Sequence, residues 1–497
     1  MILANLAALQ IVLPLLAAPL CVLFRREAVS YAIALAASWL SLAVSIALLQ
    51  SVLSSGPIAY HFGGWAPPWG IEYRVDEVNA FVLLIVTAIG AVVISYAAPS
   101  VAKEISQPRR YLFYTSYLLC LTGLLGVTIT GDAFNIFVFL EISSLSSYIL
   151  ISLGQDRRAL TAAYRYLIFG TIGATFYLIG VGLLYQVTGT LNIADLAQRI
   201  DPLIGNRTVR VAFVFVVVGI AMKAALFPLH IWLPNAYAYA PSVVTAFLAA
   251  TATKVSIYVL LRIFLTVFGP EFAFDAFQLG YVLMPFAIAA MFVGSAVAIF
   301  EPDIKRMLAY SSVAQIGYMV LGISLATSLG VAAGILHLFN HALIKGALFL
   351  AMGCVFYRIG SVQLTDMAGI GKRMPWTMGA FVAGGLSLIG VPATVGFISK
   401  WYLILAALEK GWWWVAVLVL LSSLLAIVYV WRVVEVAYFK DAPDGGPDGG
   451  AEVREAPLVM LVPTWTLILA NIYFGLDTRV SVGVALKAAE SLMGAGG

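Results

Sequence analysis

Three lysines lie far inside long hydrophobic segments of the chain: Lys223, Lys254 and Lys400. An ammonium group at the centre of a bilayer costs about 2.5–3.5 kcal/mol on insertion scales, so natural segments carry one mainly when it has a partner or a function. Burial readily lowers the pKa of a lysine, which lets the side chain take up and release a proton. The three lysines therefore predict a membrane protein that moves protons or cations.

One carboxylate, Glu141, lies in the middle of a further apolar segment. A lone carboxylate in such a place must be protonated or paired. The simplest satisfied arrangement is an ion pair between Glu141 and Lys223. A static pair that only fixes packing is the alternative, but apolar packing replaces such pairs at little cost, which favours a functional pair.

Two further lysines differ in how firmly their positions indicate a function. Lys254 lies thirteen residues after Pro241, near the centre of its segment and beside Thr253. Its polar neighbours indicate that Lys254 lines a hydrated path, which favours a role in transport. The alternative is a structural lysine whose side chain snorkels to the membrane interface. Lys400 follows an interruption at residues 390–396, and we interpret it as a counterpart of Lys223.

A histidine pair is spaced for one helix face. His337, His341 and Lys345 are separated by four residues each, so a helix places all three on the same side. Two histidines at this spacing can bind zinc, but no third ligand accompanies them and Lys345 would repel a cation. We therefore expect no metal, and the alternatives are a proton relay and hydrogen-bonded core histidines.

Several other polar residues are secondary candidates. His230 lies near a predicted helix break, where a gate and a helix cap are equally compatible with its position. Asp132 lies near a helix end, where capping explains it. Asp76 and Glu77 precede an apolar segment and are expected to be solvated.

The main candidates form a line of titratable groups that could carry protons within the membrane plane. In chain order this line is Glu141, Lys223, Lys254, the histidine pair and Lys400. As a hypothesis, separation of Glu141 from Lys223 lowers the proton affinity of that lysine, and its proton moves toward Lys254. The histidines would pass it to Lys400 for release.

Composition places these residues in an integral membrane protein. Of 497 residues, 62% are hydrophobic and 10% are charged, whereas soluble chains carry about 25% charged residues. The formal charge of +4 reflects loop lysines and arginines and excludes a nucleic-acid surface. Three cysteines in apolar segments lack metal-ligand spacing, and no dinucleotide, P-loop, haem or iron–sulfur motif occurs. We expect no cofactor and no redox or hydrolytic chemistry in this chain.

Apolar runs long enough to span a bilayer predict an all-α polytopic fold with about fourteen transmembrane helices. The runs fall near 3–24, 30–53, 78–99, 111–129, 132–152, 162–187, 209–230, 242–266, 277–300, 304–325, 328–356, 376–406, 412–438 and 457–475. Glycine and proline interrupt the seventh and twelfth runs. Interrupted helices occur at membrane depth where protein or water satisfies the freed backbone groups.

Loop charges predict the orientation. Lysines and arginines gather in alternate loops, which should be cytoplasmic; they are Arg25/Arg26, Lys103/Arg109/Arg110, Arg157/Arg158, Lys305/Arg306 and Lys372/Arg373. Fourteen helices then place both termini outside the plasma membrane. The first segment lacks a positive n-region and is not a cleavable signal. Residues 54–77 and 440–455 are expected to be loops, the second a flexible cytoplasmic linker.

An internal repeat is visible at an offset of 170–172 residues. Residues 185–195 resemble residues 357–366, and both segments end a predicted spanning helix. A unit of five helices is odd, so the two copies should be inverted, with broken helices meeting near the midplane. We predict N-terminal helices at 1–110, repeats at 111–270 and 271–440, and a linker with the last helix at 441–497.

Four motifs resemble the antiporter-like subunits of the complex I superfamily, over essentially the whole chain. They are residues 132–141 (DAFNIFVFLE), 222–234 (MKAALFPLHIWLP), 311–318 (SSVAQIGY) and 340–349 (NHALIKGALF). The superfamily includes membrane subunits of NADH dehydrogenase, Mrp-type Na+/H+ antiporters and membrane-bound hydrogenases. The resemblance implies fourteen helices, two inverted five-helix repeats, broken helices 7 and 12, and assembly with other membrane subunits.

By that resemblance, Glu141–Lys223 is the coupling pair, Lys254 the connecting lysine and Lys400 the terminal lysine of the second half. Lys400 and the short C-terminal region make the D-type subunit of Mrp antiporters the most similar branch. Residues 235–237 (NAY) depart from the Asp-Ala-His that complex I relatives often have, which puts the role of that loop in doubt.

Three functions are compatible with the sequence. The first is a proton-translocating subunit of a multisubunit cation/proton antiporter, with protons carried here and Na+ a second candidate ion. The second is the proton-pumping module of a redox-driven complex I relative or hydrogenase. The third is a passive scaffold, against which the three buried lysines weigh.

Overall fold

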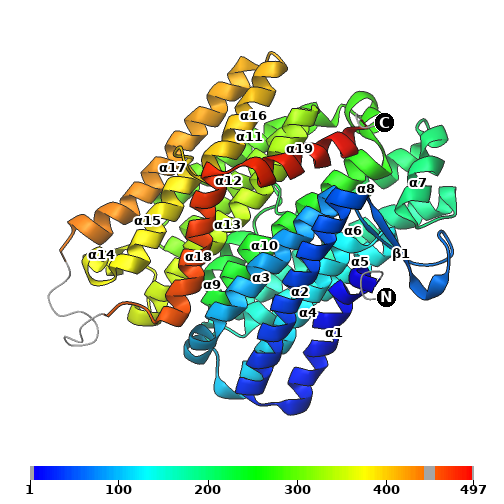
Figure 1. Cartoon of the computed structure of the whole chain (residues 1–497). Coiled ribbons are helices and arrows are strands. Elements are labelled where there is room, and N and C mark those ends of the chain that lie inside the picture. Colours follow the sequence, from blue (N-terminus) through cyan, green and yellow to red (C-terminus); the bar gives the residue numbers. More distant parts are fainter. Residues whose placement is uncertain (1–4, 442–453, 495–497) are drawn as a thin grey trace.

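A computed structural model describes residues 5–441 and 454–494, and the chain is almost entirely helical (Figure 1). The helices are α1 (Leu6–Phe24), α2 (Glu27–Ser55), α3 (Glu77–Glu104), α4 (Arg110–Ile129), α5 (Ala133–Ser152), α6 (Arg157–Thr188), α7 (Ile193–Ile200), α8 (Arg207–Lys223), α9 (Leu233–Tyr239), α10 (Ser242–Arg262), α11 (Leu279–Phe300), α12 (Ile304–Ser324), α13 (Ser328–Ile359), α14 (Ile370–Arg373), α15 (Pro375–Ile389), α16 (Val395–Glu409), α17 (Trp413–Phe439), α18 (Leu458–Leu476) and α19 (Arg479–Met493).

Twelve helices of the described residues are long and apolar enough to cross a membrane. The two remaining predicted spans are the interrupted ones. The seventh run is α8 followed by a turn and the short α9, and the twelfth run is α15 and α16 separated by residues 390–394. The predicted interruptions are therefore present, and they shorten the helices on either side of each break.

A hairpin and the last helix are among the elements that the sequence does not predict. The expected loop at residues 54–77 contains an antiparallel hairpin of β1 (Ile58–His61) and β2 (Glu72–Val75). A final helix, α19, was not predicted, because its mixed composition lacks a spanning apolar run; its buried face packs against α13 and α3. Most of the predicted linker at 440–455 lies outside the described residues.

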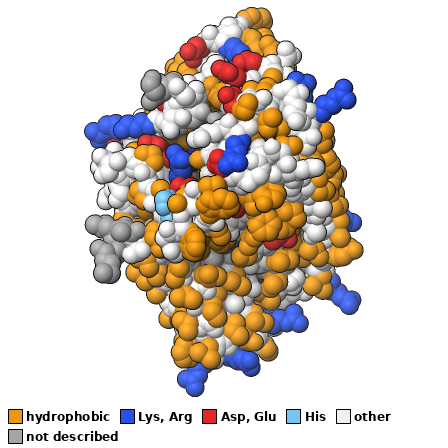
Figure 2. Space-filling view, turned by 90° about the vertical axis from the view of Figure 1, so that its right-hand side faces the viewer, with side chains coloured by type: hydrophobic (Ala, Val, Ile, Leu, Met, Phe, Trp, Pro, Cys, Tyr) orange, Lys and Arg blue, Asp and Glu red, His pale blue; other side chains and the backbone are white. Residues whose placement is uncertain are grey.

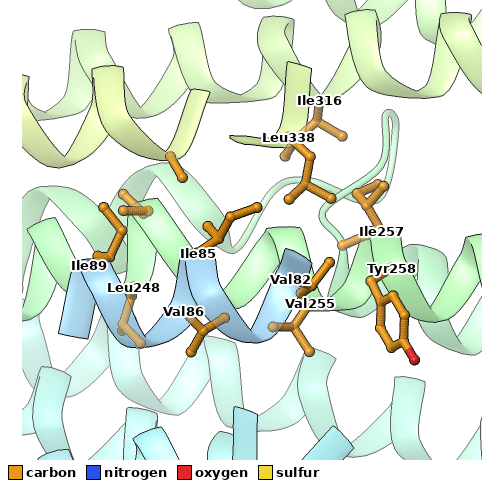
Figure 3. Packing of buried hydrophobic residues seen from close by; sticks show 14 of the residues in the cluster. Val82, Ile85, Val86, Ile89, Leu248, Val255, Ile257, Tyr258, Ile316 and Leu338 are labelled. Atoms are coloured by element: carbon orange, nitrogen blue, oxygen red, sulfur yellow. The ribbon is translucent and has the colours of Figure 1, made fainter. Parts of the chain in front are cut away.

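The core is built from α3, α10 and α13. Branched apolar side chains of these helices interdigitate, with Val82 and Ile89 of α3 beside Val255 and Leu248 of α10 (Figure 3). α1, α2, α6, α11 and α17 instead leave much of their apolar surface exposed. In Figure 2 hydrophobic side chains cover a broad part of the face, as a lipid environment favours.

Two matching corners support the predicted repeat. Asp132 caps α5 and bridges to Asn192, and 171 residues later Asp303 caps α12 and bridges to Gln363. The first corner lies beside a cavity at the start of α3, whereas the second lies beside a cavity at the end of α3. Because α3 spans the bundle, the corners lie at opposite ends, which is the relation of inverted copies. The inverted repeat and its boundaries stay a prediction.

The expectation that Asp76 is solvated is wrong. Asp76 caps α3, is buried, and forms an ion pair with Arg262 of α10, a partner that sequence reasoning missed. Burial acts to raise the pKa of Asp76, but the Arg262 guanidinium and the backbone N–H groups of α3 hold it below its ordinary value. The pair thus fastens α10 to α3 at one end of the core.

Asp76→Asn should destabilise the protein by about 3–5 kcal/mol, because it leaves the Arg262 guanidinium buried without a counter-charge. A depressed carboxylate pKa gives stabilisation that is present above the unfolded pKa, about 3.9, and is lost as pH falls through the folded pKa. The difference in unfolding free energy between the native protein and Asp76→Asn should therefore be constant between about pH 5 and pH 8. Thermal unfolding of the purified protein measures it, with Glu77→Gln as the control; equal midpoints for both variants would contradict the prediction.

Candidate functional site

α5 and α8 bring together the predicted ion pair. Lys223 Nζ lies 3.2 Å from Glu141 Oε1 and donates a hydrogen bond of 2.6 Å to Ser144 Oγ, one turn further along α5. The Lys223 side chain is 3% exposed and the Glu141 side chain 25% exposed. The predicted contact is confirmed, while its role in transport stays a prediction.

α8 ends at Lys223 for identifiable reasons. Pro228 and Pro234 cannot continue a helical hydrogen-bond ladder, and Ala225 adopts a positive φ of 55°. The Trp232 indole then satisfies a freed carbonyl, donating to Met222 O at 2.9 Å. The same indole stacks on the Tyr166 ring of α6 with centroids 3.9 Å apart. This packing holds the lysine at the end of a helix, where a small backbone change can move it.

Lys254 lies in the middle of α10 and is fully buried. Its ammonium group donates to the carbonyl of Ala249 and, at 3.4 Å, to Thr253 Oγ1. In the described part of the chain it forms no ion pair with a carboxylate. It interacts electrostatically with His341 and Lys345 of α13, which packs against α10. Because the Lys254 side chain is fully buried among the described residues, it does not extend to the membrane interface. This excludes the alternative in which the side chain snorkels.

The histidines share one face of α13, as predicted, but their surroundings differ. The His337 Nδ1 is 2.8 Å from Ser399 Oγ, and its Nε2 is 2.9 Å from Gln315 Oε1. The His341 ring lies nearly parallel to it, with centroids 6.1 Å apart. Neither nitrogen of His341 has a hydrogen-bond partner among the described residues, although the side chain is fully buried. His337 therefore fits the hydrogen-bonded core histidine of the alternative interpretation, whereas His341 makes no such bond to the described residues, and the proton relay stays a prediction.

Lys345, one turn beyond His341, faces α12. Its ammonium group donates to Leu308 O at 2.8 Å and to the Ser311 hydroxyl. No carboxylate forms an ion pair with it among the described residues. Lys345 therefore joins the histidine face of α13 to the first half of α12.

Lys400 interacts with the end of a broken helix. Its ammonium group donates to Leu388 O at 3.0 Å and Ile389 O at 2.8 Å, the last carbonyls of α15. The C-terminal end of a helix carries partial negative charge, and the Tyr318 ring adds a cation–π contact at 5.0 Å. These groups stabilise an ammonium without a carboxylate partner. Ser399, bonded to His337, precedes Lys400 directly and links it to the histidine pair.

The contacts of the secondary candidates are with other residues. Asp132 Oδ1 accepts the Asn135 N–H at 2.7 Å and so caps α5. His230 lies in the break after α8, stacked on Phe227 at 5.2 Å, with Nδ1 unpartnered among the described residues. The gate and the cap both remain compatible with it. Among the described residues, no group of three His, Cys, Asp or Glu side chains could hold a metal ion.

Sequence reasoning missed the neutral partners of the charged groups. Ser144, Gln315, Tyr318 and Ser399 each contact a candidate residue. Gln315 and Tyr318 do lie within the 311–318 motif, and Ser399 is adjacent to Lys400. Hydroxyl and amide side chains are common, so only the folded geometry distinguishes these four from others.

A family model described as NADH:quinone oxidoreductase/Mrp antiporter, transmembrane, matches residues 130–426. The chain belongs to this family. It is an antiporter-type subunit of the kind found in Mrp and complex I-like membrane modules, which confirms the predicted resemblance. The matched region contains every candidate from Asp132 to Lys400.

Similar proteins include subunits of NADH-quinone oxidoreductase and of Na(+)/H(+) antiporters. NADH-quinone oxidoreductase subunit N of Desulforudis audaxviator is 45% identical, covering 95% of this chain and 96% of the relative. The D-type subunit of the Na(+)/H(+) antiporter of Alkalihalophilus pseudofirmus is 31% identical, covering 98% and 97%. Among solved structures, a chain of the Mrp complex from Dietzia sp. DQ12-45-1b superposes with a TM-score of 0.90 at 28% identity, covering 99% and 98%. A chain of an archaeal membrane-bound sulfane sulfur reductase gives 0.88 at 31%, covering 98% of both chains.

Proposed function

We propose that this chain translocates protons within a multisubunit membrane complex, along the line Glu141, Lys223, Lys254, Lys345, His341, His337 and Lys400. The observation that carries the proposal is the burial of four lysines at membrane depth, of which only Lys223 has a carboxylate partner among the described residues. Each of the other three is held by neutral oxygens. Such surroundings tolerate both the charged and the neutral amine, as proton transfer requires.

The ion pair supplies the control step. While Glu141 is 3.2 Å from Lys223, the carboxylate stabilises the ammonium form. When a neighbouring charge draws Glu141 away, the ammonium loses this stabilisation and the proton moves toward Lys254. Because Lys223 ends α8 beside a break, the displacement needs no unwinding of a continuous helix.

In this proposal the histidines connect the two halves. His341 lies between Lys345 and His337 on α13, and Ser399 leads from His337 to Lys400. A neutral imidazole accepts a proton at one nitrogen and gives one up at the other. Lys400 then receives the proton at the second broken helix and releases it on the other side of the membrane.

The first candidate complex is a cation/proton antiporter, and the second is a redox-driven proton pump. The Mrp complex superposition favours the first, and the 45% identity to a subunit of NADH-quinone oxidoreductase favours the second. Positive loops support an orientation with both termini outside the plasma membrane. The residues carry no compact carboxylate cage for a hard cation, so protons are the ion proposed for this subunit.

One experiment tests the function and separates the two complexes. The native complex is purified with its partner subunits, reconstituted in liposomes, and assayed for proton flux. Flux driven by a Na+ gradient identifies the antiporter, and flux that requires an electron donor and bound redox cofactors identifies the pump. A complex that moves no protons under either condition overturns the proposal.

A further inference from the structure

Lys305 is not the loop residue that the sequence predicts. It lies in the first turn of α12, is 4% exposed, and donates to Ala240 O at 2.7 Å, at the junction of α9 and α10. A lysine in the first turn of a helix faces the positive end of the helix dipole, which disfavours its charge. Burial adds a further cost. Its position is therefore unfavourable for a residue that serves only to set topology.

The nearby carboxylates are engaged elsewhere. Glu104 Oε2 accepts the Ser242 N–H at 2.8 Å and the Ser242 hydroxyl at 3.1 Å, so it caps α10. Asp303 accepts from the Arg306 N–H and from Gln363. Both carboxylates act electrostatically on Lys305, but neither forms a close ion pair with it in the described chain. The other charged groups that line the cavity beside it are Lys103, Asp156 and Arg158.

A cavity of about 420 Å³ opens beside Lys305 at the end of the bundle predicted to face the cytoplasm. Its walls come from the end of α3, the turn between α5 and α6, the α9–α10 junction and the second corner motif at Asp303 and Gln363. Both signs of charge line it, so it suits water and protons better than an anion or a metal cation. Lys305 forms part of its wall, and the cavity contains none of the residues of the proposed line.

The first two turns of α12 lead from Lys305 toward the contacts of Lys345. Leu308 follows one turn later, and its carbonyl accepts from Lys345 at 2.8 Å. Ser311 follows in the next turn, and its hydroxyl also accepts from Lys345. Six residues of helix make about 1.7 turns and cover about 9 Å, so Ser311 lies about 9 Å along α12 from the cavity wall. One stretch of α12 thus joins the cavity wall to a contact of the proposed line, with the side chains of Lys305 and Ser311 about 120° apart around the helix axis.

We propose that this cavity is the aqueous access of the proton path, and that Lys305 takes protons from it and passes them along α12, by way of Ser311, to Lys345. The inference rests on the proposed function and adds the point of uptake to it. Access at this point supplies Lys345, whereas the Glu141–Lys223 pair keeps the control step of the proposed function. Uptake and control then lie at different residues.

Two neighbouring serines give a matched test of the route. Ser311 and Ser312 are both buried, and each donates to Leu308 O, at 2.9 Å and 3.0 Å, but only Ser311 accepts from Lys345. Ser311→Ala should lower proton flux through the reconstituted complex roughly tenfold or more, in line with the contribution of a positioned proton-transfer group. Ser312→Ala should leave flux within about twofold of the native value.

A labelling experiment tests the cavity itself. Gln155 is exposed and lines it, and the three native cysteines are buried. A membrane-impermeant thiol reagent applied to the predicted cytoplasmic face should block proton flux in Gln155→Cys. It should not do so in Lys372→Cys, an exposed site on α14 outside the cavity.

Lys305→Arg distinguishes proton transfer by Lys305 from a purely structural hydrogen bond to Ala240 O. Arginine keeps the charge and can donate to the carbonyl, but it does not release protons in proteins. We expect flux to fall with assembly intact. If Lys305→Arg and Ser311→Ala both keep native flux and Gln155→Cys is not blocked, the access route is overturned. If Lys223 and Lys400 variants keep native flux as well, the proposed function fails with it.

Discussion

Lys223→Met should reduce proton flux through the reconstituted complex by roughly 100-fold or more, the scale on which a positioned proton-transfer group acts. Methionine fills the same volume at the end of α8 but neither carries a proton nor pairs with Glu141, which lies 3.2 Å away. Flux is measured as the pH change inside liposomes that contain the native set of subunits. Lys372→Met, at an exposed lysine, should leave flux unchanged.

Loss of the pair also carries a structural cost that must be separated from the loss of transport. Lys223→Met leaves Glu141 without its counter-charge, whereas Glu141→Gln with Lys223→Met removes both charges. We expect the double variant to recover the thermal midpoint of the native complex but not its proton flux. Recovery of flux in the double variant would show that the pair is static, contrary to the proposed control step.

Lys400→Met should abolish proton flux to a similar degree, roughly 100-fold or more, because no other ammonium occupies the second broken helix. Lys400→Arg should fail as well. Arginine retains the positive charge that the Leu388 and Ile389 carbonyls stabilise, but it cannot pass its proton on. A residue that only capped α15 would tolerate this change.

Lys410 is a matched control for Lys400. It donates to Leu325 O at the end of α12 at 2.6 Å and lies 4.4 Å from the Trp412 ring centroid. It thus makes the same two kinds of contact near a helix end, away from the proposed line. Lys410→Met should leave proton flux close to native. Equal losses in the Lys400 and Lys410 variants would indicate that both lysines only stabilise helix ends.

The charged residues of this site could be predicted because charge at membrane depth is expensive. That cost identified Lys223, Lys254 and Lys400, and it required the contact of Glu141 with Lys223 that the structure contains. Proline and glycine likewise identified both broken helices, since they interrupt helical hydrogen bonding.

Residues near the ends of helices could not be placed in this way. The sequence predicts that Lys305 and Asp76 are solvated. Tertiary packing instead buries Lys305 against the α9–α10 junction and Asp76 against Arg262. The amphipathic α19 lacks a hydrophobic run, and only its packing on α13 and α3 reveals it. The serines that accept from Lys223 and Lys345, and the Tyr318 ring beside Lys400, depend on which helix faces lie together, which local sequence does not determine.

The central claim is that protons cross between the two halves through the histidines, and His341→Phe tests it most directly. Neither ring nitrogen of His341 has a hydrogen-bond partner among the described residues, so phenylalanine of similar shape removes no hydrogen bond seen in the structure. Proton flux through the reconstituted complex is measured with assembly verified, and with His61→Phe as an exposed control. The account predicts near-complete loss of flux in His341→Phe at native stability, whereas native flux in that variant would contradict it.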